Sequence, residues 1–213
     1  MDLIIPTMWK VPSFPSVVSK YADCAEVDKI VIIDNDFTNR PQIPIHKVEF
    51  ACFGVNIFVN PAWNEGYWRS ESDLLGILND DIEADAQLLK VVSQRKLARG
   101  EILGFDPSSS DADFEVENLL LDYTKPVGSQ WYGFGTCMFM RKETYNVIPN
   151  LYQVWFGDDF ICHKATKWSR FQSNRIKGEM SKTISSQGAD SSVQTRIKQD
   201  TENAHLHLLR RSQ

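Results

Sequence analysis

Two short apolar runs near the N-terminus most constrain what this chain can fold into. Residues 2–6 read DLIIP and residues 30–33 read IVII, and each run has the length of a buried strand. Between them, residues 14–27 carry apolar side chains at helical spacing, which predicts a crossover helix. A strand, a helix and a second strand of this kind form a βαβ unit with parallel strands. The N-terminal part of the chain therefore predicts an α/β fold.

The alternation of strands and helices continues through much of the remaining chain. Residues 82–99 have apolar side chains at helical spacing, whereas residues 60–70, rich in Trp, Asn and Gly, are expected to form a loop. This pattern predicts an α/β sandwich with a mostly parallel central sheet flanked by helices. The further strands are expected at residues 56–59, 74–78, 101–104 and 137–140.

Two segments break this alternation. Residues 105–118 are acidic and rich in turn-forming residues, so we expect a loop or a flap there. From residue 171 onward the chain is polar and rich in Ser and Gln, without hydrophobic periodicity until the sequence HLHLL. We therefore expect residues 1–170 to form the core, and residues 171–213 to form a surface arm, a lid or a linker into further domains.

The composition argues against several classes of protein. The net charge is −5 and the excess of acids lies in the first 170 residues, which argues against a nucleic-acid partner. Four cysteines without a Cys-x-x-Cys pair favour reduced thiols and a cytoplasmic location. No apolar run is long enough to span a membrane, and the N-terminus lacks the basic region of a signal peptide.

Acidic pairs recur at the ends of apolar runs. In open α/β sheets, ligands bind outside the carboxyl ends of the strands. One such pair can simply cap a helix or end a strand, but three pairs in one chain favour a common functional site. The pairs are Asp34 and Asp36 in IVIIDND, Asp80 and Asp81 in LGILNDD, and Asp158 and Asp159 in FGDDF.

The first acidic pair by itself fits an aspartyl phosphatase of the HAD type. In that interpretation Asp34 is the nucleophile, Asp36 is the general acid and base, and the GDD motif binds magnesium. Three observations weigh against it. A complete strand and helix precede the motif, Phe37 stands where that family has glycine, and the NDD motif is left without a task.

Six motifs taken together resemble another family. LIIPT, VIIDNDFTN, NPAWNEG, LGILNDDIE, GTCMFMRKETY and FGDDF occur in the order and spacing of family-2 glycosyltransferases with the GT-A fold. The resemblance covers about residues 1–170. It implies a nucleotide-sugar half over about residues 1–100 and an acceptor half over about residues 101–170. It further implies an inverting, metal-dependent transfer of a glucose- or rhamnose-type hexose from a UDP-sugar to a hydroxyl of a glycan or glycoprotein acceptor.

A narrower resemblance is to the glycosyltransferase domains with which chloroviruses glycosylate their major capsid protein. It implies a capsid glycoprotein as acceptor and the host cytoplasm as location. A catalytically inactive binding domain that keeps the GT-A fold is a further alternative. The acids retained in both the NDD and the GDD motifs speak against it, and the oligomeric state is left open by the sequence.

The resemblance assigns several residues to the donor. Thr7 and Asp34 match positions that hold the nucleoside, and a carboxylate that accepts the N3–H of uracil would favour UDP. Asn64 matches the asparagine of the family's N-x-G motif. Asn79 matches a position near the ribose, and Asp80 lies beside it in the same motif.

The resemblance also assigns the metal and the base. A departing diphosphate needs its charge neutralised, and Mn²⁺ or Mg²⁺ bound by carboxylates does this. Asp81 matches the metal ligand, with Asp80 as the second choice and His205 as a candidate further ligand from the tail. Asp159 matches the base that takes the proton of the acceptor hydroxyl, and Asp158 would contact the acceptor or orient Asp159.

Overall fold

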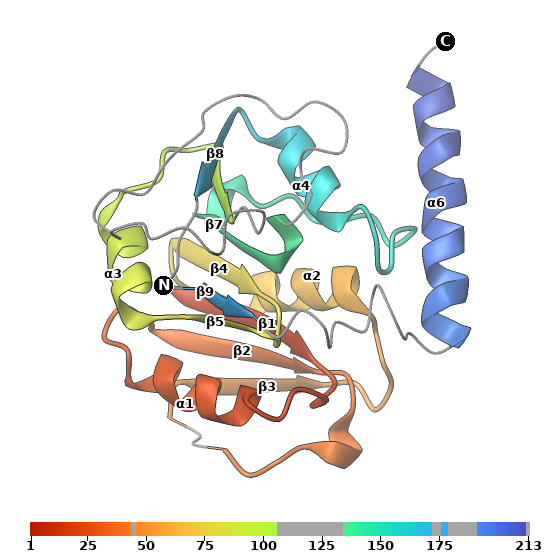
Figure 1. The fold of residues 1–213 in the computed structure, drawn as a ribbon. Coiled ribbons are helices and arrows are strands. Elements are labelled where there is room, and N and C mark those ends of the chain that lie inside the picture. The colour runs from red at the N-terminus through yellow and green to blue at the C-terminus, as the bar shows by residue number, and fades with distance from the viewer. Residues whose placement is uncertain (44–45, 106–133, 172–175, 179–190, 212–213) are drawn as a thin grey trace.

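The structure is a computed structural model in which most of the chain can be described (Figure 1). The segment predicted as a flap lies outside the described residues, apart from Phe105, which ends a strand. Among the described helices, none combines the length and the apolar character needed to cross a bilayer. The described residues are 1–43, 46–105, 134–171, 176–178 and 191–211.

The predicted βαβ unit is present. Strand β1 (Asp2–Thr7) and strand β2 (Lys29–Asp34) pair in parallel over their whole length, and helix α1 (Phe14–Asp23) crosses between them. The helix begins with Pro15 in its first turn, where a missing N–H costs nothing. Its end at Asp23 comes earlier than the predicted residue 27.

A seven-stranded sheet forms the centre of the molecule, in the order β3-β2-β1-β4-β7-β6-β8. Strand β7 alone runs against its two neighbours, so the prediction of a mostly parallel sheet is confirmed. A short two-stranded sheet pairs β5 with β9. The strands not yet given are β3 (Val48–Cys52), β4 (Leu74–Leu78), β5 (Ile82–Ala84), β6 (Glu101–Phe105), β7 (Cys137–Arg141), β8 (Lys167–Phe171) and β9 (Ile176–Gly178).

Helices cover both faces of the sheet, as Figure 1 shows. Because side chains alternate along a strand, Leu3 and Ile5 of β1 pack under α1 and α3 (Ala86–Gln94), whereas Ile4 packs on the opposite face. That opposite face is covered by α2 (Val59–Arg69) and α4 (Gly157–Lys164). The result is a three-layer sandwich with two apolar cores.

Helix α2 occupies the segment that was predicted as a loop, so that prediction is wrong, and so is the strand predicted at residues 56–59. Pro61 lies in the first turn, where proline is tolerated. Gly66 lets the helix approach β1 closely, since a Cβ there would lie 2.2 Å from Cγ2 of Ile4. The strand of this region is β3, earlier in the chain.

The helix predicted over residues 82–99 is also shorter than expected. Strand β5 takes its first three residues, and α3 begins after Asp85, whose carboxylate accepts a hydrogen bond of 2.9 Å from the N–H of Leu88. This is a standard N-cap, which satisfies one of the free N–H groups of the first turn. Leu88, Leu89 and Val92 are buried as predicted, and Val91 is half-buried.

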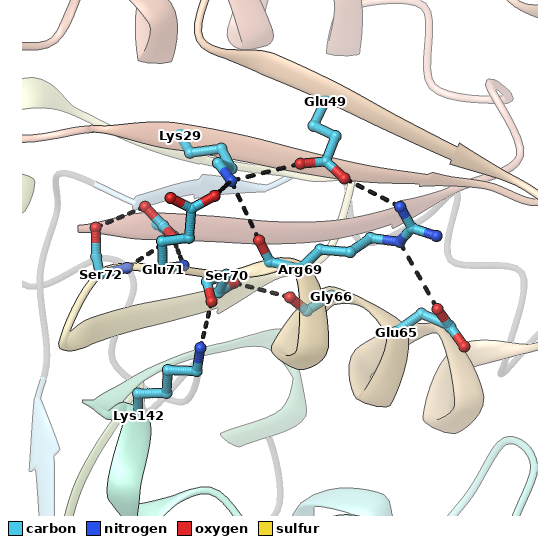
Figure 2. Close-up of polar contacts among 10 residues, drawn as sticks. Lys29, Glu49, Glu65, Gly66, Arg69, Ser70, Glu71, Ser72 and Lys142 are labelled. Carbon is cyan, nitrogen blue, oxygen red and sulfur yellow. Dashed lines mark hydrogen bonds and ion pairs between the residues drawn. The ribbon is translucent and has the colours of Figure 1, made fainter.

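A network of charged side chains surrounds the C-terminal end of α2, at the amino-terminal edge of β2 (Figure 2). The ammonium group of Lys29 donates to the carbonyl of Arg69 at 3.2 Å, and that of Lys142 donates to the carbonyl of Ser70. Arg69 in turn pairs with Glu49 at 3.0 Å. Cations near the last carbonyls of a helix stabilise its end. This network therefore stabilises α2, on the edge opposite to the acidic pairs.

The polar tail contains a long helix, α6 (Ser191–Arg211), which the sequence pattern did not predict. It stands at one side of the molecule in Figure 1. Val193 and Ile197 of α6 form a small apolar cluster with Val154, against which Phe58 packs. One turn further, Asp200 is completely buried. The helix is thus attached to the core over a narrow stripe.

Candidate active site

The order of the strands places a topological switch point at the carboxyl end of β1. The chain proceeds from β1 to β2 and β3 on one side, and then returns to place β4 on the other side of β1. Ligands of open α/β sheets bind at such a switch point. Thr7 and Asp34 are the last residues of β1 and β2, and residues 79–81 follow β4 directly.

A chain of hydrogen bonds joins these three strand ends. The hydroxyl of Thr7 donates to Asp80 at 2.7 Å and accepts from the N–H of Trp9 at 2.9 Å. The indole N–H of Trp9 donates to Asp34 at 2.8 Å. Thr7, Asp34 and Asp80, three residues predicted to hold the donor, therefore lie in one connected group. Trp9, with a left-handed backbone at φ 57°, is a member that the sequence analysis missed.

Asp34 is held firmly at the end of β2. One of its oxygens accepts from Trp9 and from the N–H of Asp36 at 3.2 Å, and the other pairs with Nε of Arg40 at 2.6 Å. The carboxylate of Asp36 turns instead to its own loop, where it accepts from Thr38 at 2.6 Å and from Asn39 at 2.7 Å. Neither carboxylate is presented as the nucleophile and acid pair of an aspartyl phosphatase.

The turn at residues 79–81 carries two carboxylates with different surroundings. Burial raises the pKa of Asp80, and the hydrogen bond from Thr7 opposes this rise. Asp81 is buried, with an exposed fraction of 5%. The main-chain N–H of Asn79 donates to the carbonyl of Thr136 at 3.0 Å, which attaches the turn to the short helix η5 (Phe134–Thr136).

The donor atoms of this turn fit one kind of cation site. Among the described residues, no three His, Cys, Asp or Glu side chains come together as a preformed cage. Mg²⁺ in phosphate-handling sites is held by one or two carboxylates together with substrate phosphates. Asp80 and Asp81 supply that number, so they fit a cation that arrives with a diphosphate. His205 falls within α6, but its side chain lies outside the described part of the chain.

The third acidic pair lies in the first turn of α4. Asp158 accepts hydrogen bonds from the N–H of Gly135 at 3.1 Å and from the N–H of Asp159 at 3.0 Å, while burial raises its pKa. For Asp159, burial first and the charge of Asp158 second raise the pKa to about 7. A carboxyl group that changes protonation near neutral pH is suited to general acid–base catalysis.

Helix η5 connects the second and third acidic pairs. Its Gly135 donates to Asp158, and the next residue, Thr136, accepts from Asn79. A Cβ at position 135 would lie 3.1 Å from Oδ2 of Asp158, so the glycine lets the main chain approach this carboxylate. All three acidic pairs are therefore linked to the same end of the sheet, two of them directly after strands and the third in the first turn of α4.

Asn64 has a structural task within α2. Its side-chain oxygen accepts from the hydroxyl of Tyr145 at 2.8 Å and from the N–H of Ile148 at 2.9 Å, and its amide donates to the carbonyl of Ile148 at 2.9 Å. With 3% of its surface exposed, the residue is occupied by these contacts. These contacts join α2 to the segment around residue 148, and the role of Asn64 as a donor contact stays a prediction.

Solved structures with the same fold are known, although the sequences have diverged far. Staphylococcus aureus TarS 1–349 in complex with UDP-GlcNAc matches with a TM-score of 0.57 at 13% identity, over 85% of this chain and 60% of that one. GalNAc-T7 with UDP, GalNAc and Mn²⁺ matches with a TM-score of 0.56 at 12% identity, over 83% and 43%. Both are GT-A glycosyltransferases, and the chain has the GT-A fold.

The same comparison also finds a structural match to another kind of enzyme. A nucleotidyl transferase from Methanothermobacter thermautotroptrophicus matches with a TM-score of 0.53 at 9% identity, over 81% of this chain and 86% of that one. No known family model matches this sequence, and no curated protein does. In comparisons with three structures of the TarS 1–349 fragment, the chain covers 57% to 60% of that fragment's length.

Proposed function

We propose that this protein is a glycosyltransferase that moves a hexose from a UDP-sugar to a hydroxyl group of a glycan or glycoprotein acceptor, with inversion at the anomeric carbon. The observation that supports this proposal most is the pairing of two acidic sites at one end of the sheet. One site, at residues 79–81, fits a diphosphate with its cation, and the other provides Asp159, whose pKa lies at about 7.

The donor would bind where Thr7, Asp34 and Asp80 are joined by hydrogen bonds. Asp34 is buried with its carboxylate bound to Trp9 and Arg40, so a nucleobase N–H would take the place of one of these two partners on the carboxylate. Asp81, with Asp80 beside it, would hold a Mn²⁺ or Mg²⁺ ion. When bound, such an ion neutralises charge on the departing diphosphate. Complexes of TarS with UDP-GlcNAc and of GalNAc-T7 with UDP and Mn²⁺ agree with this choice of ligands.

Asp159 would act as the base. In an inverting transfer, the acceptor hydroxyl attacks the anomeric carbon as its proton passes to a carboxylate and the bond to the UDP oxygen breaks. Because half of Asp159 is deprotonated near pH 7, it can accept this proton under neutral conditions. Asp158 holds the first turn of α4 through Gly135 and raises the pKa of its neighbour.

A nucleotidyl transferase is the second candidate, because an enzyme of that name has this fold. Nucleotidyl transfer moves a nucleoside monophosphate group to a sugar phosphate, whose attacking oxygen is already ionised, so no base is needed to deprotonate an acceptor hydroxyl. The raised pKa of Asp159 at the far side of η5 favours the glycosyl transfer. The two activities also release different products, which makes them simple to separate.

The deciding experiment is a panel of donors. With Mn²⁺ or Mg²⁺ present, we expect release of UDP from at least one UDP-sugar, with glucose- and rhamnose-type donors tested first. A nucleotidyl transferase, given a nucleoside triphosphate together with a sugar phosphate, would instead release pyrophosphate from the triphosphate. An aspartyl phosphatase would cleave p-nitrophenyl phosphate in a reaction lost in Asp34→Asn. Pyrophosphate or p-nitrophenol without UDP release would reject the proposal, and binding without any turnover would favour an inactive domain.

The acceptor and the cellular setting rest on the sequence alone. A capsid glycoprotein as acceptor and the cytoplasm of an infected host as location follow from the narrower resemblance to chlorovirus domains, which no comparison supports. Screening glycan acceptors of different origin, with transfer of radiolabelled sugar as the measurement, tests this part of the proposal separately from the donor panel.

A further inference from the structure

Helix α6 contacts the chain just ahead of α4 through one buried carboxylate. Asp200 is fully buried and accepts hydrogen bonds from the successive main-chain N–H groups of Gln153, Val154 and Trp155. The donor–acceptor distances range from 2.7 to 3.1 Å. Successive N–H groups that point to one side form a concave anion site. Here the anion comes from a helix 47 residues further along the chain.

Helix α2 holds the same segment through a second residue. The N–H of Asn60 donates to the carbonyl of Gln153 at 3.0 Å, and its side-chain amide donates to the carbonyl of Trp155 at 2.9 Å. A Cβ at Gly157, the first residue of α4, would lie 2.1 Å from Oδ1 of Asn60. The segment at residues 153–157 is therefore fixed by α2 through its carbonyls and by α6 through its N–H groups.

The segment needs to be held, because its backbone is strained. Phe156, the N-cap of α4, has φ 65° and ψ 8° in the left-handed region. For a residue other than glycine this costs energy, and such a conformation persists only where the surroundings impose it. Phe156 lies directly between the residues bound by Asp200 and the acids of α4. A change in the hold on residues 153–155 is therefore passed to the first turn of α4.

The remaining attachment of α6 in the described residues is modest. Val193 and Ile197 pack with Val154 in a small apolar cluster, and Asn203 donates to the carbonyl of Leu151 at 3.0 Å. In addition, the guanidinium of Arg196 lies over the ring of Phe58, and Ala204 packs against the core. None of these contacts engages an N–H group of residues 153–155. Asp200 is thus the residue of α6 that defines where this part of the main chain lies.

We propose that Asp200 is a positioning residue for Asp159: by binding three main-chain N–H groups ahead of α4, it determines where the first turn of that helix presents its carboxylates. The role of Asp159 as the base rests on the proposed function. The polar tail is then a part of the catalytic unit, because without α6 the segment before the base loses the acceptor for its N–H groups.

The first test is kinetic. Asp200→Asn keeps the shape of the side chain, but its amide nitrogen faces an N–H group and its remaining oxygen cannot serve three donors. We expect turnover to fall about 10- to 100-fold while the KM for the UDP-sugar changes by less than about twofold, because only the base is displaced. Glu202→Gln removes a charge from an exposed position of the same helix and should leave both values unchanged.

The second test does not depend on activity. The titration of the Asp159 carboxyl, followed by NMR, should move from about 7 toward the ordinary value of aspartate in Asp200→Asn, since a loosened turn admits water and relieves desolvation. The titratable groups near Asp159 on its own helix, which are Asp158, Cys162 and, one turn further, His163, are unchanged in this variant. If the unmodified protein turns over no UDP-sugar, the proposed function fails while this titration still tests the positioning.

Two results would overturn the inference. One is a folded Asp200→Asn protein with unchanged turnover and an unchanged titration of Asp159, and the other is a loss that falls on the donor KM alone. If Asp200→Asn does not fold, Asp200→Glu carries the same comparison, because it keeps the carboxylate and displaces it by one methylene. We expect Asp200→Glu to show the same split between turnover and KM with a smaller loss.

Discussion

The hydroxyl of Thr7 donates a hydrogen bond of 2.7 Å to the carboxylate of Asp80, which joins the end of β1 to the turn that follows β4. The two residues are 73 positions apart in the sequence. Since the same hydroxyl accepts from the N–H of Trp9, its proton is directed at Asp80, and this carboxylate is held toward β1. The neighbouring Asp81 is buried, with 5% of its surface exposed, whereas Asp80 is turned to Thr7, so the two acids of the turn have different surroundings.

The first prediction concerns this difference. If Asp81 is the main ligand of the cation, Asp81→Ala should abolish the gain in UDP affinity that Mn²⁺ produces, because the diphosphate then lies beside uncompensated charge. Asp80→Asn should retain most of that gain. Calorimetric titration of UDP with and without Mn²⁺ measures both. The reverse pattern would make Asp80 the ligand, and an equal response of the two variants to Mn²⁺ would remove the turn from the cation site.

The second prediction concerns the base. Asp159→Asn keeps the volume of the side chain but removes the proton acceptor, so transfer should fall by roughly 10²–10⁴ while UDP-sugar affinity changes only a few-fold. Turnover and equilibrium binding are measured on the same preparation. Near-normal transfer, or a product with retained anomeric configuration, would show that Asp159 has another task.

The third prediction is a pH dependence. Because Asp159 must be deprotonated to act, turnover should rise with pH through about 7, its pKa. Asp158→Asn removes the charge that contributes to this raised pKa, so the midpoint of the acid limb should move to lower pH. Its side-chain oxygen can still accept from Gly135. Rates measured from pH 5 to 9 at saturating donor check both statements, and a midpoint that moves upward or stays in place would contradict them.

The fourth prediction concerns the fold. Gly66→Ala places a Cβ 2.2 Å from Cγ2 of Ile4, so it should lower the free energy of unfolding by about 1–3 kcal/mol. Ile4→Ala creates room at the same place. The loss of unfolding free energy in the double variant should therefore be smaller than the sum of the losses in the two single variants. Denaturant unfolding of the unmodified protein and the three variants measures these values. Strict additivity would mean that α2 relaxes away from β1 without strain.

Five strands of the central sheet could be predicted because each is a nearly continuous apolar run, whereas β3 (VEFAC) and β8 (KWSRF) mix polar and apolar residues and were missed. Parallel strands are buried on both faces, and apolar runs such as IVII in β2 or LLGIL in β4 are stable only in such a buried position. Helix α2 could not be predicted in this way. Its Asn64 and Gly66 are typical of loops, and their value becomes visible only with partners such as Tyr145 and Ile4. Tertiary contacts override local preference here.

The site was predictable as a set of acids but not as an arrangement. Acids after strands indicated the right end of the sheet, since strand direction decides where they gather. Gly135 was missed because it acts through its main-chain N–H, which leaves no pattern in the sequence. Trp9 was missed because its indole finds its partner, Asp34, only when β1 and β2 lie side by side. Asp200 was missed for another reason. It is one acid in a polar helix, and only its burial against residues 153–155 distinguishes it from its exposed neighbours.

Helix η5 limits how far the acidic turn at residues 79–81 can move from the acidic turn at residues 158–159. Gly135 donates to Asp158, and Thr136, its immediate neighbour, accepts from Asn79, so a single dipeptide spans the interval between the two acidic turns. Because backbone bond lengths are invariant, this dipeptide keeps the distance between the two acidic turns nearly constant. Substitutions in the apolar cores can alter stability while the interval between the two acidic turns is preserved. Under the proposed function, donors that carry different sugars would then meet the same spacing of carboxylates.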